Sequence, residues 1–549
     1  CDTPNLVTGL VREGGVAKNW AWWAFLITGM VTVFIYAKLW RRSNVMTDLE
    51  FYELRYSGKG AAFLRGFRAL YLGIVFNVLI MGTVTLAAIK IGGVMLGLTP
   101  VQTVVGASIF VVIYAVVGGL KGVIWADFFQ YSVAMFGAVY AAYVAIQQPE
   151  VQAIGGMAGL LGPESPIADK LSVFPDFSDP SQWIPLLLIP LAVQWWAAWY
   201  PGAEPGGGGY VAQRMLAAKD EKNAIGATLL FNFLHYALRP WPWIIVALAS
   251  LIIYPDLVAI EKAFPDLDPQ YLKDDIAYPV MISKLGPGWL GLVLASLIAA
   301  YMSTIGTHLN WGSSYAVNDF YQRFVNPKAS QKELVRVGRI CTVLLMVLAG
   351  TLALTVLEDA TGAFNLLLLA GAGSGAIYLL RWFWWRINAI SEISAMIVTT
   401  IVAIALTAMS KNESVQEWHW GVLGWDSLKF LIAVGATTLT WLLATFLTRP
   451  EDEETLRNFY RKVQPGGPGW AKLVNKARKD GVNLGDEGKP WHLPTEILCV
   501  FVGMVMIYSS LFSIGSFVYG NIGWGISLAV VAAASCFALF ALFHRTLTR

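Results

Sequence analysis

The sequence predicts an all-α polytopic membrane protein, and three observations support this fold class. Of its 549 residues, 56% are hydrophobic and only 14% are charged, whereas a soluble domain has about 25% charged residues. Thirteen segments are apolar and long enough to cross a bilayer as helices. Basic residues gather in alternate connections between these segments. Lipid suits this composition better than water, so the lipid bilayer is the first expected partner.

The predicted helices follow one another in order along the chain. Each approaches the 20 or so apolar residues that a membrane helix needs. Prolines interrupt the fifth and the sixth helix, and such breaks are tolerated where the freed backbone groups face protein or a cavity; they are Pro185, Pro190, Pro240 and Pro242. The thirteen helices cover residues 19–39, 69–89, 101–117, 124–145, 183–200, 224–254, 289–315, 340–357, 361–383, 393–409, 428–447, 493–517 and 522–543.

The connections between the helices test this count. The connection 38–68 holds seven Lys or Arg residues, and every second connection after it is also basic. The intervening connections hold few cations and more acids. Because a wrong count would disturb the alternation at the first error, the pattern predicts that 38–68 and the C-terminus are cytoplasmic. We expect the inner (plasma) membrane of a bacterium.

Composition and connection lengths exclude several classes of protein. The longest connections, 147–182, 255–284 and 450–489, are shorter than an ordinary soluble domain of about 100 residues or more, which argues against a receptor or a fused kinase. The net charge of +3 implies no nucleic-acid partner. No cluster of His, Cys or carboxylate residues marks an enzyme within the spans, and no obligate protein partner is evident.

Two adjacent hydroxyl residues in the middle of the seventh helix are the most informative feature. Ser303 and Thr304 share a face with the carbonyl of Ala300, one turn earlier. Sodium, a hard cation, prefers several oxygen ligands, by the same logic as calcium. Serine and threonine in membrane helices also often donate to the carbonyl four residues earlier. From the residues alone, an ion site and simple back-bonding both remain open.

The surrounding sequence resembles the eighth core helix of the sodium:solute symporter family, which includes sodium/glucose and sodium/proline cotransporters. The resemblance begins at Met302-Ser303-Thr304, continues through Asn310, and ends in Asn318-Asp319-Phe320-Tyr321. Other family motifs match in the same order as in the family and cover most of residues 1–385. They lie at 50–56, 114–120, 125–130, 213–219 and 336–339.

The resemblance implies an inverted-repeat (5+5) helical bundle of the leucine-transporter type, with extra C-terminal helices. In this fold, ion and solute sites lie near mid-membrane, where the first helix of each repeat is broken. The transport core is expected at 1–385, with repeats ending at 145 and spanning 183–383. Most of the first helix is expected to precede Cys1, so that the sequence is N-terminally incomplete. Residues 386–549 supply additional helices, with a basic cytoplasmic connection at about 450–489.

The resemblance also implies sodium as the coupling ion. Ala300, Ser303 and Thr304 match the family's helix-eight ligands, and carbonyls of the broken first helix would complete the site. Asp127, near the cytoplasmic end of the fifth core helix, matches an aspartate associated with sodium movement toward the cytoplasm. The alternative for Asp127 is a helix-terminal charge in contact with water or Lys121.

Solute contacts follow less directly from the resemblance. The positions that approximately match those of related sugar carriers are Asn19, Gln194, Tyr236 and Asn365. Neighbouring tryptophans at 22, 23, 195 and 196 either stack on a sugar ring or belong to the interfacial belts of membrane proteins. The glycine-rich run 201–209 is longer than the family's usual connection. It is interpreted either as a mobile inner gate or as a flexible loop.

Arg239 lies deep in the span 224–254, where an arginine costs at least about 2.5 kcal/mol on insertion scales. It is either an anchor for a solute carboxylate or a structural partner of an acid or of carbonyls freed by nearby prolines. The sequence therefore predicts sodium-coupled symport of a small organic solute, with a sugar or polyol as the first candidate and an amino acid or carboxylate as the second. A non-transporting solute sensor and a proton-coupled carrier remain open.

Overall fold

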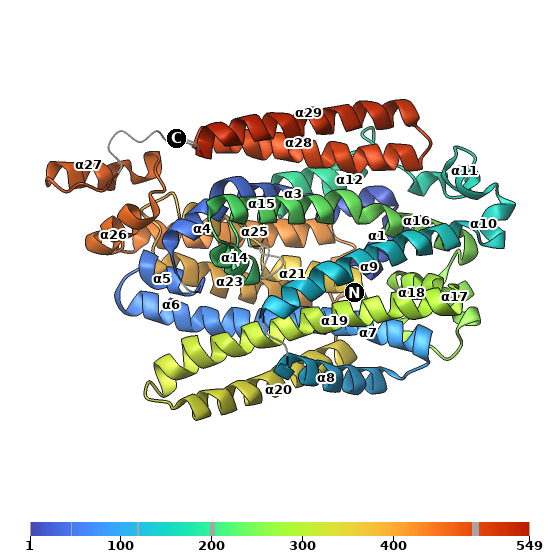
Figure 1. The fold of residues 1–549 in the computed structure, drawn as a ribbon, viewed down its shortest axis with the longest axis horizontal. Coiled ribbons are helices and arrows are strands. Elements are labelled where there is room, and N and C mark those ends of the chain that lie inside the picture. The colour runs from blue at the N-terminus through green and yellow to red at the C-terminus, as the bar shows by residue number, and fades with distance from the viewer. Residues whose placement is uncertain (1, 46, 118–119, 198–203, 486–492, 548–549) are drawn as a thin grey trace.

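The computed structural model describes residues 2–45, 47–117, 120–197, 204–485 and 493–547, without the side chains of 112–117, 120–127, 210, 213 and 543–547. Its helices run side by side along the long axis of an elongated bundle (Figure 1). At one end, called here the α5 end, lie α5 (Glu50–Arg55), α26 (Glu453–Val463) and α27 (Ala471–Lys479). At the other, the α17 end, lie α10 (Pro149–Ala153), α11 (Gly156–Leu161) and α17 (Leu257–Ala263).

Eleven of the thirteen predicted spans are confirmed as helices. Among the described residues, ten stretches are long and apolar enough to cross a membrane, and α8 (Pro100–Val117) matches the span 101–117. The ten are Val16–Ser43, Gly58–Leu96, Phe128–Ile146, Glu221–Ile253, Pro287–Val325, Gln331–Thr355, Ala389–Met409, Trp425–Leu447, Leu493–Val518 and Ile522–Leu542. The protein is therefore an integral membrane protein. A two-residue strand pair, β1 (His419–Trp420) and β2 (Leu423–Gly424), is a minor addition.

Two of the predicted spans are broken in the structure: the interruption predicted for 183–200 is confirmed, whereas the prediction of an unbroken helix over 361–383 is wrong. The span 183–200 is divided into α12 (Pro180–Trp183), η5 (Ile184–Leu188), α13 (Ile189–Ala192) and η6 (Gln194–Trp196). Its prolines remove backbone donors that a continuous helix requires. The span 361–383 is divided into α21 (Ala360–Ala370) and α22 (Gly375–Leu380). Gly373, between them, has a φ of +76°, a conformation that favours glycine.

The interruption predicted at Pro240 and Pro242 takes the form of a π-helical turn and a bend at Arg239, directly before Pro240. α15 (Glu221–Phe233), the π-helical turn η7 (Leu234–Leu238) and α16 (Pro240–Ile253) form one apolar span. Pro240 stands in the first turn of α16, where the missing N–H has no intrahelical partner to lose. The preceding π turn absorbs the change of register.

A short helix at the start of the chain has no counterpart among the predicted spans. α1 (Asp2–Gly14) is buried along Pro4–Arg12 and packs against α16, α18 (Ala277–Ile282), α21 and η9 (Asp274–Ile276). The N-terminal end of α1 lies in the middle of the bundle, away from both ends (Figure 1).

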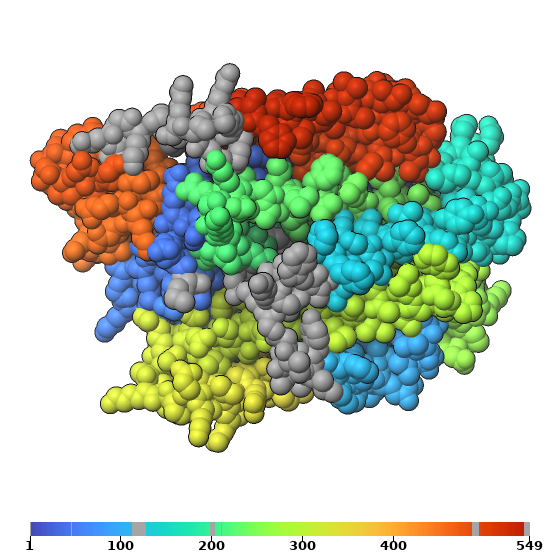
Figure 2. Space-filling model, in the orientation of Figure 1, coloured from blue at the N-terminus to red at the C-terminus, as the bar shows by residue number. Residues whose placement is uncertain are grey.

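The C-terminal helices attach to the bundle in two separate places. α23 (Ala389–Met409) and α25 (Trp425–Leu447) pack on each other and on α21. α28 (Leu493–Val518) and α29 (Ile522–Leu547) form a hairpin that covers the upper edge of the molecule in Figure 2, where α26 and α27 project from the α5 end. α28 contacts three pieces of the bundle, α3 (Leu26–Val31), η2 (Thr32–Tyr36) and η7.

Candidate ion and solute site

The three residues predicted to bind sodium lie together on α19 (Pro287–Ser314). Ser303 and Thr304 are half-buried. The Thr304 hydroxyl donates to the Ala300 carbonyl oxygen over 2.9 Å, so the back-bonding that the sequence left open is present. Donation uses the hydroxyl proton and leaves the oxygen lone pairs available. The arrangement thus groups oxygens that suit a hard cation.

α19 is fixed against α7 (Asn77–Leu96) on either side of these hydroxyls. The Asn77 amide nitrogen donates to the His308 carbonyl over 2.8 Å, and its amide oxygen lies 2.6 Å from His308 Nδ1. Two residues before Ser303, the Tyr301 hydroxyl lies 3.3 Å from the Thr85 hydroxyl of α7. Asp2, at the start of α1, lies within electrostatic range of His308. α1 and α19 both pack on α7.

The backbone of Asp127 lies near the start of α9 (Leu120–Ile146), which packs along α19. Its side chain lies outside the part of the chain that the structure describes, and its role in ion movement stays a prediction.

Three of the four predicted solute residues converge around Trp22. The Trp22 indole donates to the Asn19 amide oxygen over 2.9 Å, and its ring stacks on Tyr236 with centroids 5.8 Å apart. The Gln194 amide donates to the carbonyl of Ala21 over 2.5 Å. Asn19, Gln194 and Tyr236 come from three elements, η1 (Val16–Asn19), η6 and η7, and all are buried. Of these, η6 lies inside the broken span 183–200, and η7 is the π-helical turn before α16.

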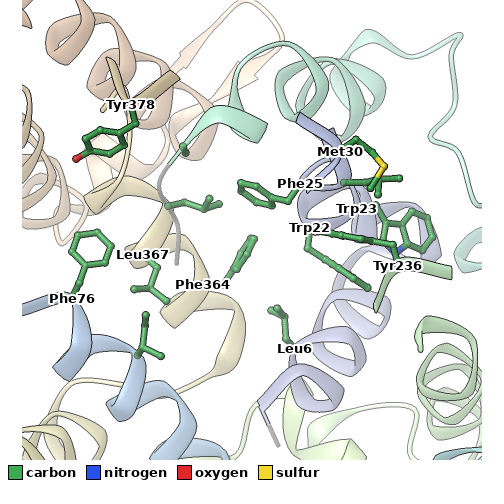
Figure 3. Close-up of a cluster of buried hydrophobic side chains, with 14 of the residues drawn as sticks. Leu6, Trp22, Trp23, Phe25, Met30, Phe76, Tyr236, Phe364, Leu367 and Tyr378 are labelled. Atoms are coloured by element: carbon green, nitrogen blue, oxygen red, sulfur yellow. The ribbon is translucent and has the colours of Figure 1, made fainter. Parts of the chain in front are cut away.

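Figure 3 shows Trp22 and Tyr236 side by side within a cluster of buried rings to which Phe25 and Phe364 also belong. The fourth predicted solute residue, Asn365, is exposed on α21, next to the buried Phe364. The structure thus does not bring Asn365 into the group formed by Asn19, Gln194 and Tyr236.

Arg239 has partners other than those proposed from the sequence. Its Nη1 lies 2.9 Å from His235 Nδ1, and its guanidinium carbon lies 4.9 Å from the centre of the Trp243 ring. Asp2 and Tyr131 are within electrostatic range. Within the described residues, the guanidinium thus contacts an imidazole and an indole, and its role toward a solute stays a prediction. A ring face stabilises a cation, and more so where water is excluded.

The described part of the glycine-rich run 201–209 is buried and holds an ion pair that sequence reasoning missed. Residues 204–209, called here the glycine plug, are buried, so they are not a solvent-exposed flexible loop. Both carboxylate oxygens of Glu204 accept from Arg68 Nη2, over 2.8 and 3.0 Å, and the two side chains are 2% and 1% exposed. Arg68 Nη1 donates to the Tyr378 hydroxyl over 2.7 Å. A single acid within a glycine run was the signal available in the sequence.

The backbone of the glycine plug also forms hydrogen bonds with side chains of other elements. The Trp40 indole donates to the Gly206 carbonyl over 2.7 Å, and Gly209 N–H donates to the Asp48 carboxylate over 2.8 Å. Asp48 also accepts from the Tyr315 hydroxyl, and burial raises the pKa of the Asp48 carboxyl to about 6. Gly206 and Gly207 have φ values of +85° and +80°, which only glycine adopts without cost.

Two adjacent acids connect three helices near the α17 end. Asp274 accepts from Arg12 Nε of α1 over 2.8 Å. Asp275 pairs with Lys90 of α7 and accepts from Ala360 N–H, at the start of α21, over 3.0 Å. We call Asp274 and Asp275 the acid clamp, because together they join α1, α7 and α21.

Comparison with known proteins gives a family-level match. The model of the sodium:solute symporter family matches residues 7–399. A sodium/glucose cotransporter of Vibrio parahaemolyticus is 27% identical over 402 residues, which is 70% of this chain and 71% of the relative. A sodium/myo-inositol cotransporter 2 of Oryctolagus cuniculus is 29% identical over 66% of this chain, and a Sus scrofa protein of that name is 27% identical over 55%. These two alignments span 56% and 46% of the relatives' own lengths.

Among solved structures, a sodium-coupled sialic acid symporter in a substrate-bound outward-open state aligns with a TM-score of 0.55. The alignment has 20% sequence identity and covers 82% of this chain and 91% of that one. At this identity the similarity concerns the fold. It confirms the predicted all-α inverted-repeat bundle.

Proposed function

The chain belongs to the sodium:solute symporter family, and on this premise we propose that it carries a sugar or polyol across the membrane together with sodium. The observation that carries the choice of solute is the group formed by Asn19, Trp22, Gln194 and Tyr236. Its aromatic faces match the apolar face of a sugar ring, and its amides retain hydrogen-bonding capacity for hydroxyl groups. The names of the sodium/glucose and sodium/myo-inositol relatives point in the same direction.

Sodium binds, in this proposal, to the oxygens of Ala300, Ser303 and Thr304 and to main-chain groups of the first broken helix. The packing of both α1 and α19 on α7 supports this location. The α5 end faces the cytoplasm and the C-terminus lies there too, as the basic connections favour, in the inner membrane of a bacterium. Residues 1–385 form the transport core, and 386–549 are additional helices.

Transport proceeds by alternating access between two closures. We assign one closure to the glycine plug, which is bound to Arg68 and Trp40, and the other to the acid clamp, which joins α1, α7 and α21. For solute to pass, the contacts at one end must open while those at the other hold. The inward sodium gradient and the membrane potential drive the cycle, since each charge moved gains about 2.3 kcal/mol per 100 mV.

Sodium-driven uptake of labelled myo-inositol and glucose into proteoliposomes tests the proposal. Ser303→Ala and Thr304→Ala are each expected to raise the sodium concentration for half-maximal uptake by about tenfold, because each change removes one oxygen ligand. Ser296→Ala is the matched control, since its hydroxyl is on the same helix and donates to the Val293 carbonyl over 2.8 Å. It should leave the sodium dependence unchanged.

Uptake that ignores sodium in the wild type and in both variants rules out the ion assignment. Replacing sodium by lithium, or by a proton gradient at fixed sodium, distinguishes a proton-coupled carrier. Solute binding without any flux into the liposomes would instead indicate a sensor.

Arg239 supports a second candidate, a carboxylate or amino-acid solute. For a sugar or polyol, Arg239→Gln is expected to change the solute KM by less than about threefold, because the guanidinium already contacts His235 and Trp243. For a carboxylate, losing a charged hydrogen bond predicts a rise of at least about tenfold, partly restored by Arg239→Lys. Inhibition of wild-type uptake by an excess of organic acids provides an independent measurement.

A further inference from the structure

The extra helix α28 lies across the seam between the two elements that supply Trp22 and Tyr236. It contacts α3 and η2 on one side of the seam and η7 on the other. The packing is close: a Cβ on Gly503 would lie 2.8 Å from the Met30 sulfur, and a Cβ on Gly515 would lie 1.9 Å from the Trp241 ring. Glycine at these positions lets α28 approach both elements at once.

The second span is irregular immediately after Trp22. α2 (Trp20–Trp23) ends, and α3 begins at Leu26. Ile27 N–H donates to the Ala24 carbonyl, whereas in an unbroken α-helix it would donate to Trp23. The Trp23 carbonyl is therefore released from the regular ladder, and a buried carbonyl needs another donor.

Tyr508 of α28 supplies that donor. Its hydroxyl donates to the Trp23 carbonyl over 2.9 Å, and its ring lies against Trp20, with centroids 5.4 Å apart. One turn along α28, the Leu511 carbonyl accepts from the Trp241 indole over 2.7 Å. α28 thus donates to the irregular segment beside Trp22 and accepts from the helix that follows Tyr236.

We propose that Tyr508 is a positioning residue for the solute site, which holds the break after Trp23 so that Trp22 stays stacked on Tyr236. This inference rests on the proposed function, since it assumes that the group around Trp22 binds the solute. Tyr508 acts through the backbone of Trp23. Through Tyr508, the α28–α29 hairpin would raise the affinity of the site for the solute.

The test compares Tyr508 of α28 with Tyr519, which lies in the turn between α28 and α29 and donates to a different carbonyl. Tyr508→Phe keeps the ring and removes the bond to Trp23. Tyr519→Phe is the matched control, because its half-buried hydroxyl donates over 2.7 Å to the Leu171 carbonyl, which lies outside the second span. Tyr508→Phe is expected to raise the KM for myo-inositol about three- to tenfold, with maximal rate and sodium dependence unchanged. Tyr519→Phe is expected to leave this KM unchanged.

Hydrogen exchange of the purified protein measures the same effect without reference to any solute. Amides of residues 24–29 are expected to exchange faster in Tyr508→Phe than in the wild type or in Tyr519→Phe, because the break has lost its external donor. Trp241→Phe, which removes the donor to Leu511, is expected to change KM in the same direction.

Unchanged exchange at 24–29 in Tyr508→Phe overturns the inference, whatever the solute proves to be. Faster exchange with an unchanged KM, in a protein that transports myo-inositol, also overturns it, because the bond would then be structural only. If the wild type takes up no sugar or polyol, the proposed solute fails, and the exchange result alone decides whether Tyr508 holds the break.

Discussion

Glu204→Ala and Arg68→Ala are each expected to abolish nearly all sodium-driven uptake. Glu204 and Arg68 are 2% and 1% exposed and hydrogen-bonded to each other. Removing either partner leaves an uncompensated charge in the interior, which costs about 3–5 kcal/mol. Because Glu204 belongs to the glycine plug, the lost free energy destabilises the folded position of this segment first. We therefore expect the closure at the α5 end to weaken before the whole bundle unfolds.

Two measurements separate loss of closure from loss of fold. Uptake with and without a sodium gradient should show that the single variants lose gradient-driven accumulation, and thermal unfolding should report their remaining stability. The double variant Arg68→Gln/Glu204→Gln removes both charges and is expected to recover part of the uptake, since the two sites are directly coupled. Full activity in both single variants would refute the plug as a closure.

An exposed ion pair at the same end provides the control. Arg42 Nε lies 3.1 Å from the Glu221 carboxylate, and both side chains are about one third exposed. Pairs of this kind contribute about 0–1 kcal/mol. Glu221→Ala is therefore expected to keep uptake close to that of the wild type, which shows whether burial of the pair, and not the presence of charge, decides the result.

Asp275→Asn is expected to reduce both uptake and thermal stability strongly, whereas Asp274→Asn next to it should reduce them only slightly. Lys90, the partner of Asp275, is fully buried, so its ammonium group would lose its ion pair with Asp275 at a cost of about 3–5 kcal/mol. Asp274 is 31% exposed, and its partner Arg12 also donates to Ser250 and to the Tyr254 carbonyl.

This pair of variants changes one atom in each of two adjacent residues, so it compares burial directly. Thermal unfolding and uptake of both variants should be measured in one preparation. Lys90→Met combined with Asp275→Asn removes both charges and is expected to restore stability in part. Equal effects of Asp274→Asn and Asp275→Asn would show that burial of the Lys90 pair is not what closes this end.

Some features of the site follow from local sequence and some do not. Eleven spans were predictable because the length of an apolar segment and the charge of its flanks are local properties. The hydroxyls of α19 were found because their motif lies within one helix. The interruption of 183–200 was predictable from its prolines, whereas the break inside 361–383 was missed, since the apolar composition of that span is the same whether or not the backbone turns at Gly373.

By itself, the sequence determined that this is a membrane protein, where most of its helices lie and which family it resembles. The first two follow because insertion into lipid depends on the apolar length and the flanking charge of each segment separately. Only the tertiary structure decided which buried charges pair. Glu204 pairs with Arg68, which is 136 residues away in the sequence, and Tyr508 donates to the Trp23 carbonyl, which is 485 residues away. A buried polar group must have a partner, but its own segment does not state which distant helix supplies it.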